Sequence, residues 1–591
     1  MKDLVLVSVL FFVAWSLGAQ GDPGNSFSVW KAGTDGPSQA FYIDVITDPP
    51  EEPARSMAEW EALQAIAVSY DLTGFSEEKK KLVAEIIRHA QQEVDVMVFC
   101  YGSLVFNIIS RVRNDLQRRG VPLNRVHFIE TNFNGRIWIR DYGAHTVYLN
   151  DVDSLVLVDW KYEPQYQEAD EEVSNAMSSF LNVPLYSTTA LPFRLKLDGG
   201  NFLTDGNGMA FSSSHVLEDN PLDPSTIDFT VAEFMGIEQY PKLQKLDYDV
   251  IHHVDMHMKL IDEETLLVGE YPEGVADGPR IEENINWFVE NVKTVFGTDY
   301  RVERILMPPD EYGNYPDSLN NCSAHPGYGC YYTYTNALFI NKLVLVPTYF
   351  DGGYYDSLAL VRWQEIMPGY DIVGIDCREI IREYGAIHCV TKEIGENKPI
   401  RIIHQKRLTG CADATYQEVR VKVQHASGIE KVKVFFRTHE NPVYRSLEMD
   451  DLGDGNYLGN LPNTMFGDTI SYYFEATAND GKTFTRPYPG PEGPYQLAIN
   501  CMTTGLAEKS LEDAVRIYPN PGNEIFIEIT NPDWKNASWT LQGINGIIQK
   551  QGMLQHSHQQ IITKGEIPAG LYFLVLEKEG RRGVFKVVFG L

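Results

Sequence analysis

The strongest constraint on the fold is a long stretch, residues 51–405, in which helix-like and strand-like segments alternate. Ser76 is a suitable N-cap for a helix in which Leu82, Ile86 and Ala90 share one face. Strand-like apolar runs cover residues 94–100, 125–129, 154–160, 266–270, 338–347 and 372–375, and a helical pattern covers 281–295. This alternation predicts an α/β domain.

The rest of the 591-residue chain has a different pattern. In residues 411–501, Val419, Val421 and Val423 alternate with polar residues, and turn signals such as Asp454-Gly455 separate the runs. This pattern predicts a β-sandwich of immunoglobulin type. Residues 512–591 predict a second small all-β sandwich domain.

The first residues predict export. Residues 1–20 have the features of a signal peptide, because Lys2 precedes an apolar run and small residues follow it. Residues 21–50 predict a leader or linker. The apolar run is short for a membrane span and no later segment qualifies, so we expect no integral membrane span.

The net charge of −31 argues against nucleic-acid binding and is consistent with simple solubility or with attraction of a cationic substrate.

In an exported protein the seven cysteines predict disulfides. We expect Cys322 to pair with Cys330 across a short loop, and Cys411 to pair with Cys501 across the predicted sandwich. Cys100 and Cys377 lie in or beside apolar runs and are expected to be buried thiols. Cys389 remains, and the odd count predicts at least one free thiol.

Four short motifs carry the candidate chemistry, and a fifth, Asp198-Gly-Gly-Asn201, lies among them. The four are 138–143, 253–257, 334–336 and 385–389. Cleavage of a guanidinium group needs carboxylates to hold the cation, a soft nucleophile to attack its carbon, and a proton carrier for the leaving ammonia. Asp141 and Asp255 can be the carboxylates, His253 the proton carrier and Cys389 the nucleophile.

Each feature also has a structural interpretation. A single Cys after a strand is often a buried apolar residue, and Arg-Asp before Gly is often a turn. If residues 253–257 form a strand, His253, Asp255 and His257 share one face and could bind a metal. The spacing matches no zinc signature that we can justify, and a metal leaves Cys389 unexplained. On a strand His388 would face away from Cys389, so we interpret His388 as structural.

In order along the chain, five motifs after the opening Arg55–Glu61 motif resemble those of the agmatine deiminase and bacterial peptidylarginine deiminase family. The resemblance covers about residues 50–405. It implies an α/β five-bladed propeller (pentein) of ββαβ units with the site on the central axis. It also implies that Cys389 is the nucleophile, His253 the acid and base, and Asp141 and Asp255 the guanidinium ligands. Asn336 would be a neighbouring polar contact and Trp138 a substrate contact, and no metal or other cofactor is implied.

The two all-β domains resemble the tail of secreted bacterial peptidylarginine deiminases. The last one resembles a type IX secretion sorting domain, by Tyr518-Pro-Asn-Pro521 and the terminal Lys586-Val-Val588. The resemblance implies a Bacteroidetes source, the type IX secretion machinery as a partner, and a location outside a Gram-negative cell or on its outer-membrane surface.

The substrate stays open between an agmatine-like amine and an arginine-containing peptide. The resemblance implies that peptidylarginine-specific relatives bind the substrate carboxylate with a basic pair, and the acidic stretch 162–172 lacks that pair, whereas export favours peptides. Alternatives are a free-arginine deiminase, an amidinotransferase, and a non-catalytic surface adhesin. Glycine and tyrosine at 350–355 and in the 322–330 loop predict a lid at the mouth of the site, with a plain solvated loop pair as the alternative.

Overall fold

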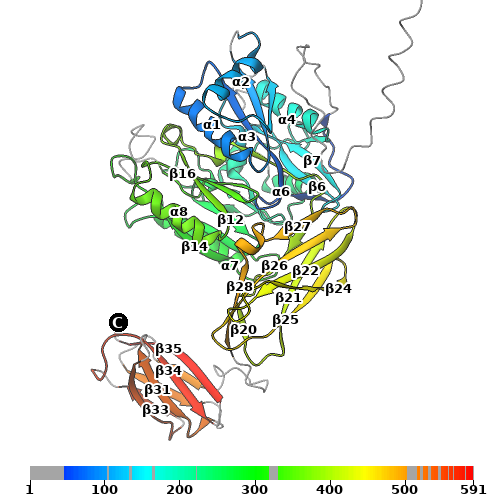
Figure 1. Ribbon diagram of the computed structural model, residues 1–591. Helices are drawn as coiled ribbons and strands as arrows, with labels where there is room; N and C mark the ends of the chain where they lie inside the picture. Colours follow the sequence, from blue (N-terminus) through cyan, green and yellow to red (C-terminus); the bar gives the residue numbers. More distant parts are fainter. Residues whose placement is uncertain are drawn as a thin grey trace, which may run out of the picture. The chain divides into compact units, whose positions relative to one another are not determined.

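The computed structural model consists of two compact units, residues 1–410 with 416–499 and residues 411–415 with 500–591 (Figure 1). The structure describes residues 45–102, 105–131, 136–162, 167–220, 223–317 and 331–501 of the chain. It also describes residues 515–518, 524–529, 534–543, 547–556, 558–562, 565–578 and 581–589. The predicted signal peptide, most of the predicted leader, Cys322 and Cys330 lie outside these ranges.

A repeated ββαβ unit organises residues 45–395 of the first unit. The clearest example is β12 (Met258–Asp262), β13 (Thr265–Glu270), α7 (Gly278–Asn291) and β14 (Arg301–Leu306). The two leading strands form an antiparallel hairpin, and β14 then pairs parallel to β13. A parallel strand requires a crossover connection, which α7 supplies. Helix α7 corresponds to the helical pattern predicted at 281–295, but it begins and ends a few residues earlier than that range.

Four further sheets among the described residues follow the same order. They are β6 (His145–Leu149), β7 (Ser154–Asp159), α4 (Gln167–Leu181) and β8 (Leu185–Ser187); β9 (Leu203–Thr204), β10 (Ala210–Ser213), α6 (Pro224–Met235) and β11 (Lys242–Leu243); β15 (Leu338–Ile340), β16 (Leu343–Thr348), α8 (Tyr354–Ile366) and β17 (Asp371–Asp376); and β18 (Lys392–Gly395), β3 (Leu63–Asp71), α1 (Glu77–Ala90) and β4 (Asp95–Tyr101), extended by α2 (Ile108–Arg118) and β5 (Val126–Glu130). Two short strands, β1 (Val45–Ile46) and β2 (Ala54–Ser56), lie at the edges of the β6–β7–β8 sheet. The predicted α/β domain is confirmed.

One of these sheets joins the two ends of the α/β domain. Strand β18 pairs antiparallel with β3, so Lys392 lies opposite Ala67 and Glu393 opposite Ile66. Cys389 comes three residues before β18. The position of Cys389 is therefore set by strand pairing across most of the domain.

Local sequence signals gave some elements correctly and missed one turn. Ser76 caps α1, because its Oγ accepts a hydrogen bond from the backbone N of Lys79 at 3.1 Å. The run 338–347, predicted as one strand, is instead the hairpin of β15 and β16. The turn contains Asn341 at φ 55°, a left-handed conformation that asparagine tolerates. Its Oδ1 accepts a hydrogen bond from the backbone N of Leu63 at 2.9 Å, which holds the turn in place.

All-β structure follows the α/β domain. One sheet is ordered β19-β21-β25-β24 and the other β20-β28-β26-β22-β23, with β27 paired to β26. The strands are β19 (Arg401–Ile403), β20 (Thr409–Cys411), β21 (Tyr416–Gln424), β22 (Ile429–Arg437), β23 (Arg445–Glu448), β24 (Asp450–Gly453), β25 (Asn456–Pro462), β26 (Thr469–Ala478), β27 (Thr483–Arg486) and β28 (Tyr495–Cys501). The alternating valines of β21 are buried, as the pattern predicts. Because β19 pairs with β21, this region begins by Arg401.

Cysteine pairing is as predicted where the structure describes it. Cys411 and Cys501 form a disulfide, whereas Cys100, Cys377 and Cys389 are free and buried.

The second unit also contains two sheets, ordered β29-β30-β33 and β32-β31-β34-β35. Its strands are β29 (Val515–Tyr518), β30 (Ile525–Ile529), β31 (Ser538–Gly543), β32 (Ile548–Met553), β33 (His558–Ile562), β34 (Gly570–Lys578) and β35 (Arg581–Phe589). Among the described residues, no helix combines the length and the apolar character that a membrane span needs.

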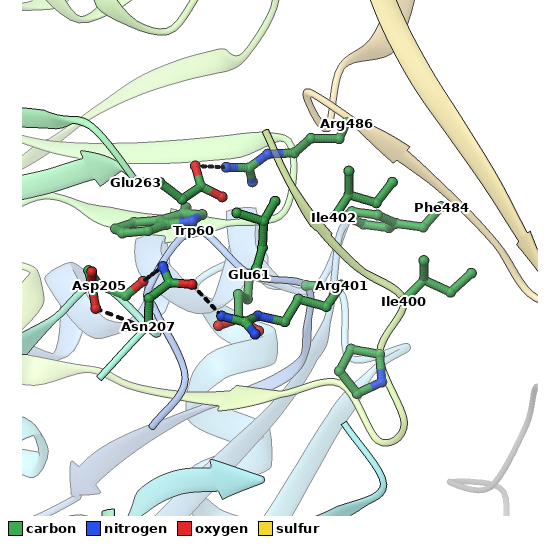
Figure 2. Close-up of a pocket in the computed structure, with 13 residues that line it drawn as sticks. Trp60, Glu61, Asp205, Asn207, Glu263, Ile400, Arg401, Ile402, Phe484 and Arg486 are labelled. Atoms are coloured by element: carbon green, nitrogen blue, oxygen red, sulfur yellow. Dashed lines mark hydrogen bonds and ion pairs between the residues drawn. The ribbon is translucent and has the colours of Figure 1, made fainter. Parts of the chain in front are cut away.

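Ion pairs join the α/β domain to the first all-β region. Arg486 of β27 lies 2.9 Å from Glu263, and both side chains are buried. Arg401 of β19 lies 2.6 Å from Asp151 and donates to the carbonyl of Gly206 at 2.6 Å. Figure 2 shows the pocket between these elements, with Arg401 and Arg486 on one side and Glu263 opposite. Trp60 and Glu61 line this pocket, immediately after Glu59 in the chain.

Candidate functional site

Cys389 lies in a single turn of 3-10 helix, His388–Val390, rather than on or after a strand. Its sulfur is buried and faces two polar side chains. The Nδ2 of Asn336 lies 3.2 Å from Sγ, and Oδ2 of Asp255 lies 3.6 Å from it. Burial, followed by the negative charges of Asp255 and Asp141, raises the pKa of the thiol well above its usual value. The thiolate therefore needs a cation beside it.

Residues 253–257 do not form a strand, the condition under which their side chains would share one face. Val254–Met256 forms another single 3-10 turn, with His253 at its start. His253 and Asp255 nevertheless approach the same point, which is marked by Gly200 in the turn Gly199–Asn201. A Cβ on Gly200 would lie 2.7 Å from Nδ1 of His253, 3.0 Å from Oδ2 of Asp255 and 3.3 Å from Oδ1 of Asp141. Only glycine leaves room for these three groups to converge.

Asp141 is held by the backbone of this glycine. It lies in the short helix α3 (Ile139–Tyr142), and its Oδ1 accepts a hydrogen bond from the N–H of Gly200 at 3.0 Å. Burial raises the pKa of Asp141 to about 7, although the charge of His253 opposes this shift. The carboxylate form is thus favoured when a cation is present.

Two carboxylates surround His253. Its Nε2 lies 3.3 Å from Oδ2 of Asp198, and its Nδ1 lies 3.9 Å from Oδ1 of Asp141. Burial lowers the pKa of His253, but the charges of Asp141 and Asp198 outweigh burial and raise it to about 10. Within the described residues, Nδ1 accepts or donates no hydrogen bond. His253 is therefore a protonated acid at neutral pH, with one nitrogen available.

His388 does not face away from the site, which corrects the expectation from the sequence. Its Nδ1 lies 2.7 Å from Oδ2 of Asp255, and its Nε2 lies 2.9 Å from Oε1 of Glu59. An imidazole donates to two carboxylates only as the cation. Lys259 also pairs with Glu59. Burial raises the pKa of Asp255, but the hydrogen bond and charge of His388 outweigh burial, so that the net pKa is below its usual value.

Arg140 contacts the turn that carries His388 and Cys389. Its guanidinium pairs with Glu393 of β18 through contacts of 2.7 and 2.5 Å, and both side chains are buried. Its Nε donates to the backbone carbonyl of His388 at 3.0 Å. Arg140 therefore positions the His388–Val390 turn while its neighbour Asp141 faces Gly200.

Trp138 lies beside Cys389. A Cβ on Gly385 would lie 2.3 Å from Cζ3 of Trp138 and 3.1 Å from Cβ of Cys389, so this glycine allows the ring and the cysteine to pack together. The structure thus brings together the six residues predicted from the sequence, which are Trp138, Asp141, His253, Asp255, Asn336 and Cys389. It adds Glu59, Asp198 and Gly200, which lie inside motifs that the sequence already displays, and His388.

The predicted lid and the alternative of a metal site have different outcomes. The carboxylate of Asp356 accepts hydrogen bonds from the backbone N of Tyr349, Phe350 and Gly352, which ties this segment to α8. The lid stays a prediction, and its second part, the loop 322–330, lies outside the described residues. Within the described ranges no three His, Cys, Asp or Glu side chains form a metal-binding group. The His253, Asp255 and His257 alternative thus has no geometric support.

Comparison with known proteins places this geometry in a family. The Porphyromonas-type peptidyl-arginine deiminase family matches residues 55–394. A Vibrio parahaemolyticus protein, provisionally named an agmatine deiminase, is 24% identical over 289 residues, which is 46% of this chain and 78% of the relative. A Legionella pneumophila protein with the same provisional name is 26% identical over 281 residues, or 43% of this chain and 72% of the relative.

Solved structures share the fold of the α/β domain. The agmatine deiminase of Enterococcus faecalis superposes with a TM-score of 0.50 at 19% identity, over 60% of this chain and 99% of that one. The domain is accordingly of the pentein-like α/β type, followed by all-β sheets. The chain belongs to the Porphyromonas-type peptidyl-arginine deiminase family and is a guanidino-group deiminase, a hydrolase.

Proposed function

We propose that the protein hydrolyses a guanidinium group to a ureido group and ammonia, with Cys389 as the nucleophile. The observation that carries this proposal is the convergence of Asp141, His253 and Asp255 on Gly200, with the Cys389 sulfur 3.6 Å from Asp255. The substrate is a small guanidino compound such as agmatine, or an arginine side chain in a peptide. Asp141 and Asp255 hold the guanidinium through charge-assisted hydrogen bonds, and Trp138 contacts its stem.

The bound cation makes the thiolate accessible. Asp255 and Asp141 disfavour a thiolate in the empty site, and a guanidinium between them supplies the missing positive charge. The Cys389 thiol loses its proton to solvent as the cation binds, and the thiolate then attacks the guanidinium carbon, so that a C–S bond forms. His253 gives its proton to the departing nitrogen, and the C–N bond breaks to release ammonia. A thiouronium remains on Cys389, and Asn336 stays beside the sulfur.

A water molecule completes the reaction. His253, now neutral, takes a proton from water as the oxygen attacks the same carbon. The C–S bond breaks, the proton left on the product oxygen passes through solvent to the released ammonia, and the neutral ureido product leaves. Cys389 takes back the proton that it lost to solvent, and His253 is again the imidazolium. The overall change is one guanidinium plus one water to one urea group plus one ammonium ion.

Replacing Cys389 tests this function. Cys389→Ser is expected to lower turnover by at least about 10³-fold, because a hydroxyl is a far weaker nucleophile here. Cys100→Ala is the control, since Cys100 is also a buried free thiol but lies in β4. Full activity of Cys389→Ser, with ureido product and ammonia measured, would refute the role of Cys389.

Two further measurements test the alternatives. Ammonia release with and without an added amine acceptor distinguishes hydrolysis from amidino transfer. Absence of turnover on every guanidine favours the adhesin alternative.

We further propose the finer architecture and location. The ββαβ units close as a five-bladed propeller, the first all-β region is an immunoglobulin-like domain, and residues 512–591 are a type IX sorting domain. The repeated unit and the β18–β3 pairing support the propeller. Export is supported by the sequence of residues 1–20 and by the Cys411–Cys501 disulfide. Fractionation of the native bacterium, with and without residues 512–591, tests the location.

A further inference from the structure

Lys392 is a buried cation beside the site that takes no part in the chemistry above. It is the first residue of β18, three residues after Cys389, and is 1% exposed. Within the described residues its ammonium forms neither a hydrogen bond nor an ion pair, although the more distant carboxylates of Glu393, Glu59 and Asp141 act on its charge. Burial of an ammonium without a close counterion is unfavourable, so a lysine here is costly to the fold unless its charge is used.

Of these three carboxylates, only that of Asp141 has no cation at close range. Arg140 pairs with Glu393 at 2.7 Å, and the imidazole of His388 lies 2.9 Å from Glu59. Oδ1 of Asp141 instead accepts a hydrogen bond from a backbone N–H at 3.0 Å, and its nearest described cation is an imidazole nitrogen 3.9 Å away. The lysine charge is thus available to Asp141 more than to the other two.

An aromatic ring connects Lys392 to Asp141. The Nζ atom of Lys392 lies 5.0 Å from the centre of the Trp160 ring, within the range of a cation–π contact. The indole Nε1 of Trp160 donates a hydrogen bond to the backbone carbonyl of Asp141 at 2.8 Å. All three side chains are buried, so water screens their charges little. Lys392 therefore contacts the ring that holds the backbone of a proposed guanidinium ligand.

The surroundings of the lysine leave little room for another position. A Cβ on Gly143 would lie 3.1 Å from Cγ of Lys392 and 2.7 Å from the backbone carbonyl O of Ile139, so helix α3 ends against the lysine stem. His145 of β6 also faces the Trp160 ring, at 6.0 Å between ring centres. Burial, followed by the charge of Lys392, lowers the pKa of His145 to about 3. The group that carries a positive charge beside Trp160 at neutral pH is therefore Lys392.

We propose that Lys392 is a positioning residue for Asp141, because its charge keeps that carboxylate ionised and its contact with Trp160 holds the backbone that presents it. This inference rests on the deiminase function proposed above, in which Asp141 binds the guanidinium as a carboxylate. Burial, followed by the charge of Arg140, lowers the pKa of Lys392 to about 8, whereas burial raises the pKa of Asp141 to about 7. Lys392 thus still carries its charge over the pH range in which Asp141 ionises.

The pH profile of kcat/KM tests this role. Lys392→Met removes the charge and keeps most of the stem, so the acidic limb is expected to move to higher pH by about 0.5–1 unit. At pH 6 its kcat/KM should be about 3- to 10-fold below that of the unmodified protein. At pH 9, where the lysine has lost its own proton, the two should agree within about twofold. Lys392→Arg restores a cation and should keep the limb within about 0.3 unit.

Trp160→Phe separates the two parts of the proposal. Phenylalanine keeps a ring against the ammonium but has no N–H, so kcat/KM should fall about 3- to 10-fold at every pH while the acidic limb stays in place. Lys242→Met is the matched control. The Nζ atom of Lys242 also lies over an aromatic ring, 4.3 Å from the centre of that of Tyr240, but its ion-pair partner Asp228 is not part of the site.

Thermal melting distinguishes positioning from a structural role. Because Lys392→Met removes a buried charge that has no close counterion, its melting temperature should not fall. An acidic limb that stays in place in Lys392→Met, or that moves equally in Lys242→Met, overturns the proposal, and a lower melting temperature with an unshifted limb assigns Lys392 to stability alone. Lys392→Gln replaces Lys392→Met if that variant is not folded.

Failure of the proposed function looks different. If the unmodified protein yields no ureido product from any guanidine compound, the deiminase function fails and this proposal fails with it. An active protein whose acidic limb is the same with and without the lysine charge overturns the role of Lys392 alone.

Discussion

The Nδ1 atom of His388 lies 2.7 Å from Oδ2 of Asp255, the same oxygen that faces the Cys389 sulfur at 3.6 Å. His388 therefore fixes the direction of Asp255 and leaves Oδ1 without a hydrogen-bond partner in the described structure. Glu59 holds the other nitrogen of the imidazole at 2.9 Å. This chain of contacts connects the opening motif of the domain to a proposed guanidinium ligand.

Glu59→Gln is expected to reduce kcat about 10- to 100-fold, because loss of the Glu59 charge loosens the imidazolium that orients Asp255. Glu59 is a positioning residue, so kcat should fall more than KM changes, and Glu59→Asp should restore part of the rate. Glu61→Gln is the matched control on the same segment, where Glu61 pairs with Arg55 at 2.6 Å. Equal activity of Glu59→Gln and the unmodified protein would contradict this role.

The pH profile of kcat/KM should have two limbs. Activity is expected to rise through about pH 7, because the raised pKa of Asp141 leaves it ionised only above that value. Activity should fall through about pH 10, because the raised pKa of His253 keeps the acid protonated below that value. An optimum below pH 6 would contradict this assignment.

Asp198→Asn tests the origin of the basic limb. The hydrogen bond and charge of Asp198 help to raise the pKa of His253, so their loss should move the basic limb to lower pH. The acidic limb should also move to lower pH, because the charge of Asp198 raises the pKa of Asp141. Asp450→Asn, at an exposed position of β24, is the control. A basic limb that stays in place would mean that another group sets it.

Arg486→Met is expected to destabilise the first unit by about 3–5 kcal/mol, because it leaves Glu263 buried without its partner. Replacing both residues, Arg486→Met with Glu263→Leu, should recover much of that loss. Denaturant unfolding of the two variants measures the difference. Equal stability of the single and double variants would show that the two charges do not depend on each other.

Removal of residues 508–591 is expected to leave kcat and KM within about twofold. The site residues all lie in the first unit, and the second unit has its own core, which includes Trp534, Trp539 and Leu574. A chain ending at Ala507 keeps both cysteines of the Cys411–Cys501 disulfide. A large loss of activity in folded protein would mean that the second unit contributes to the site.

Local patterns were sufficient for several features. The cap at Ser76 and the spacing of Leu82, Ile86 and Ala90 produced α1, and the alternating valines produced β21. These features depend on neighbours within a few residues, where the periods of helix and strand decide which side chains are buried. The choice of Cys389, His253, Asp141 and Asp255 also came from the sequence, because their motifs resemble those of a known family and a guanidinium requires those chemical types.

The tertiary structure decided where those groups point. His253, Asp255, His388 and Cys389 lie in single 3-10 turns, where no long period predicts the direction of a side chain. Their directions follow from distant contacts, among them the pairing of β18 with β3 and the Arg140–Glu393 ion pair.

The role of Gly200 was likewise set in three dimensions. The absence of a Cβ at Gly200 matters only because His253, Asp255 and Asp141 converge there in the folded chain. The sequence by itself thus determined several helices and strands and the kinds of reactive group. The folded chain alone decided which groups meet, because convergence depends on contacts between residues far apart in the sequence.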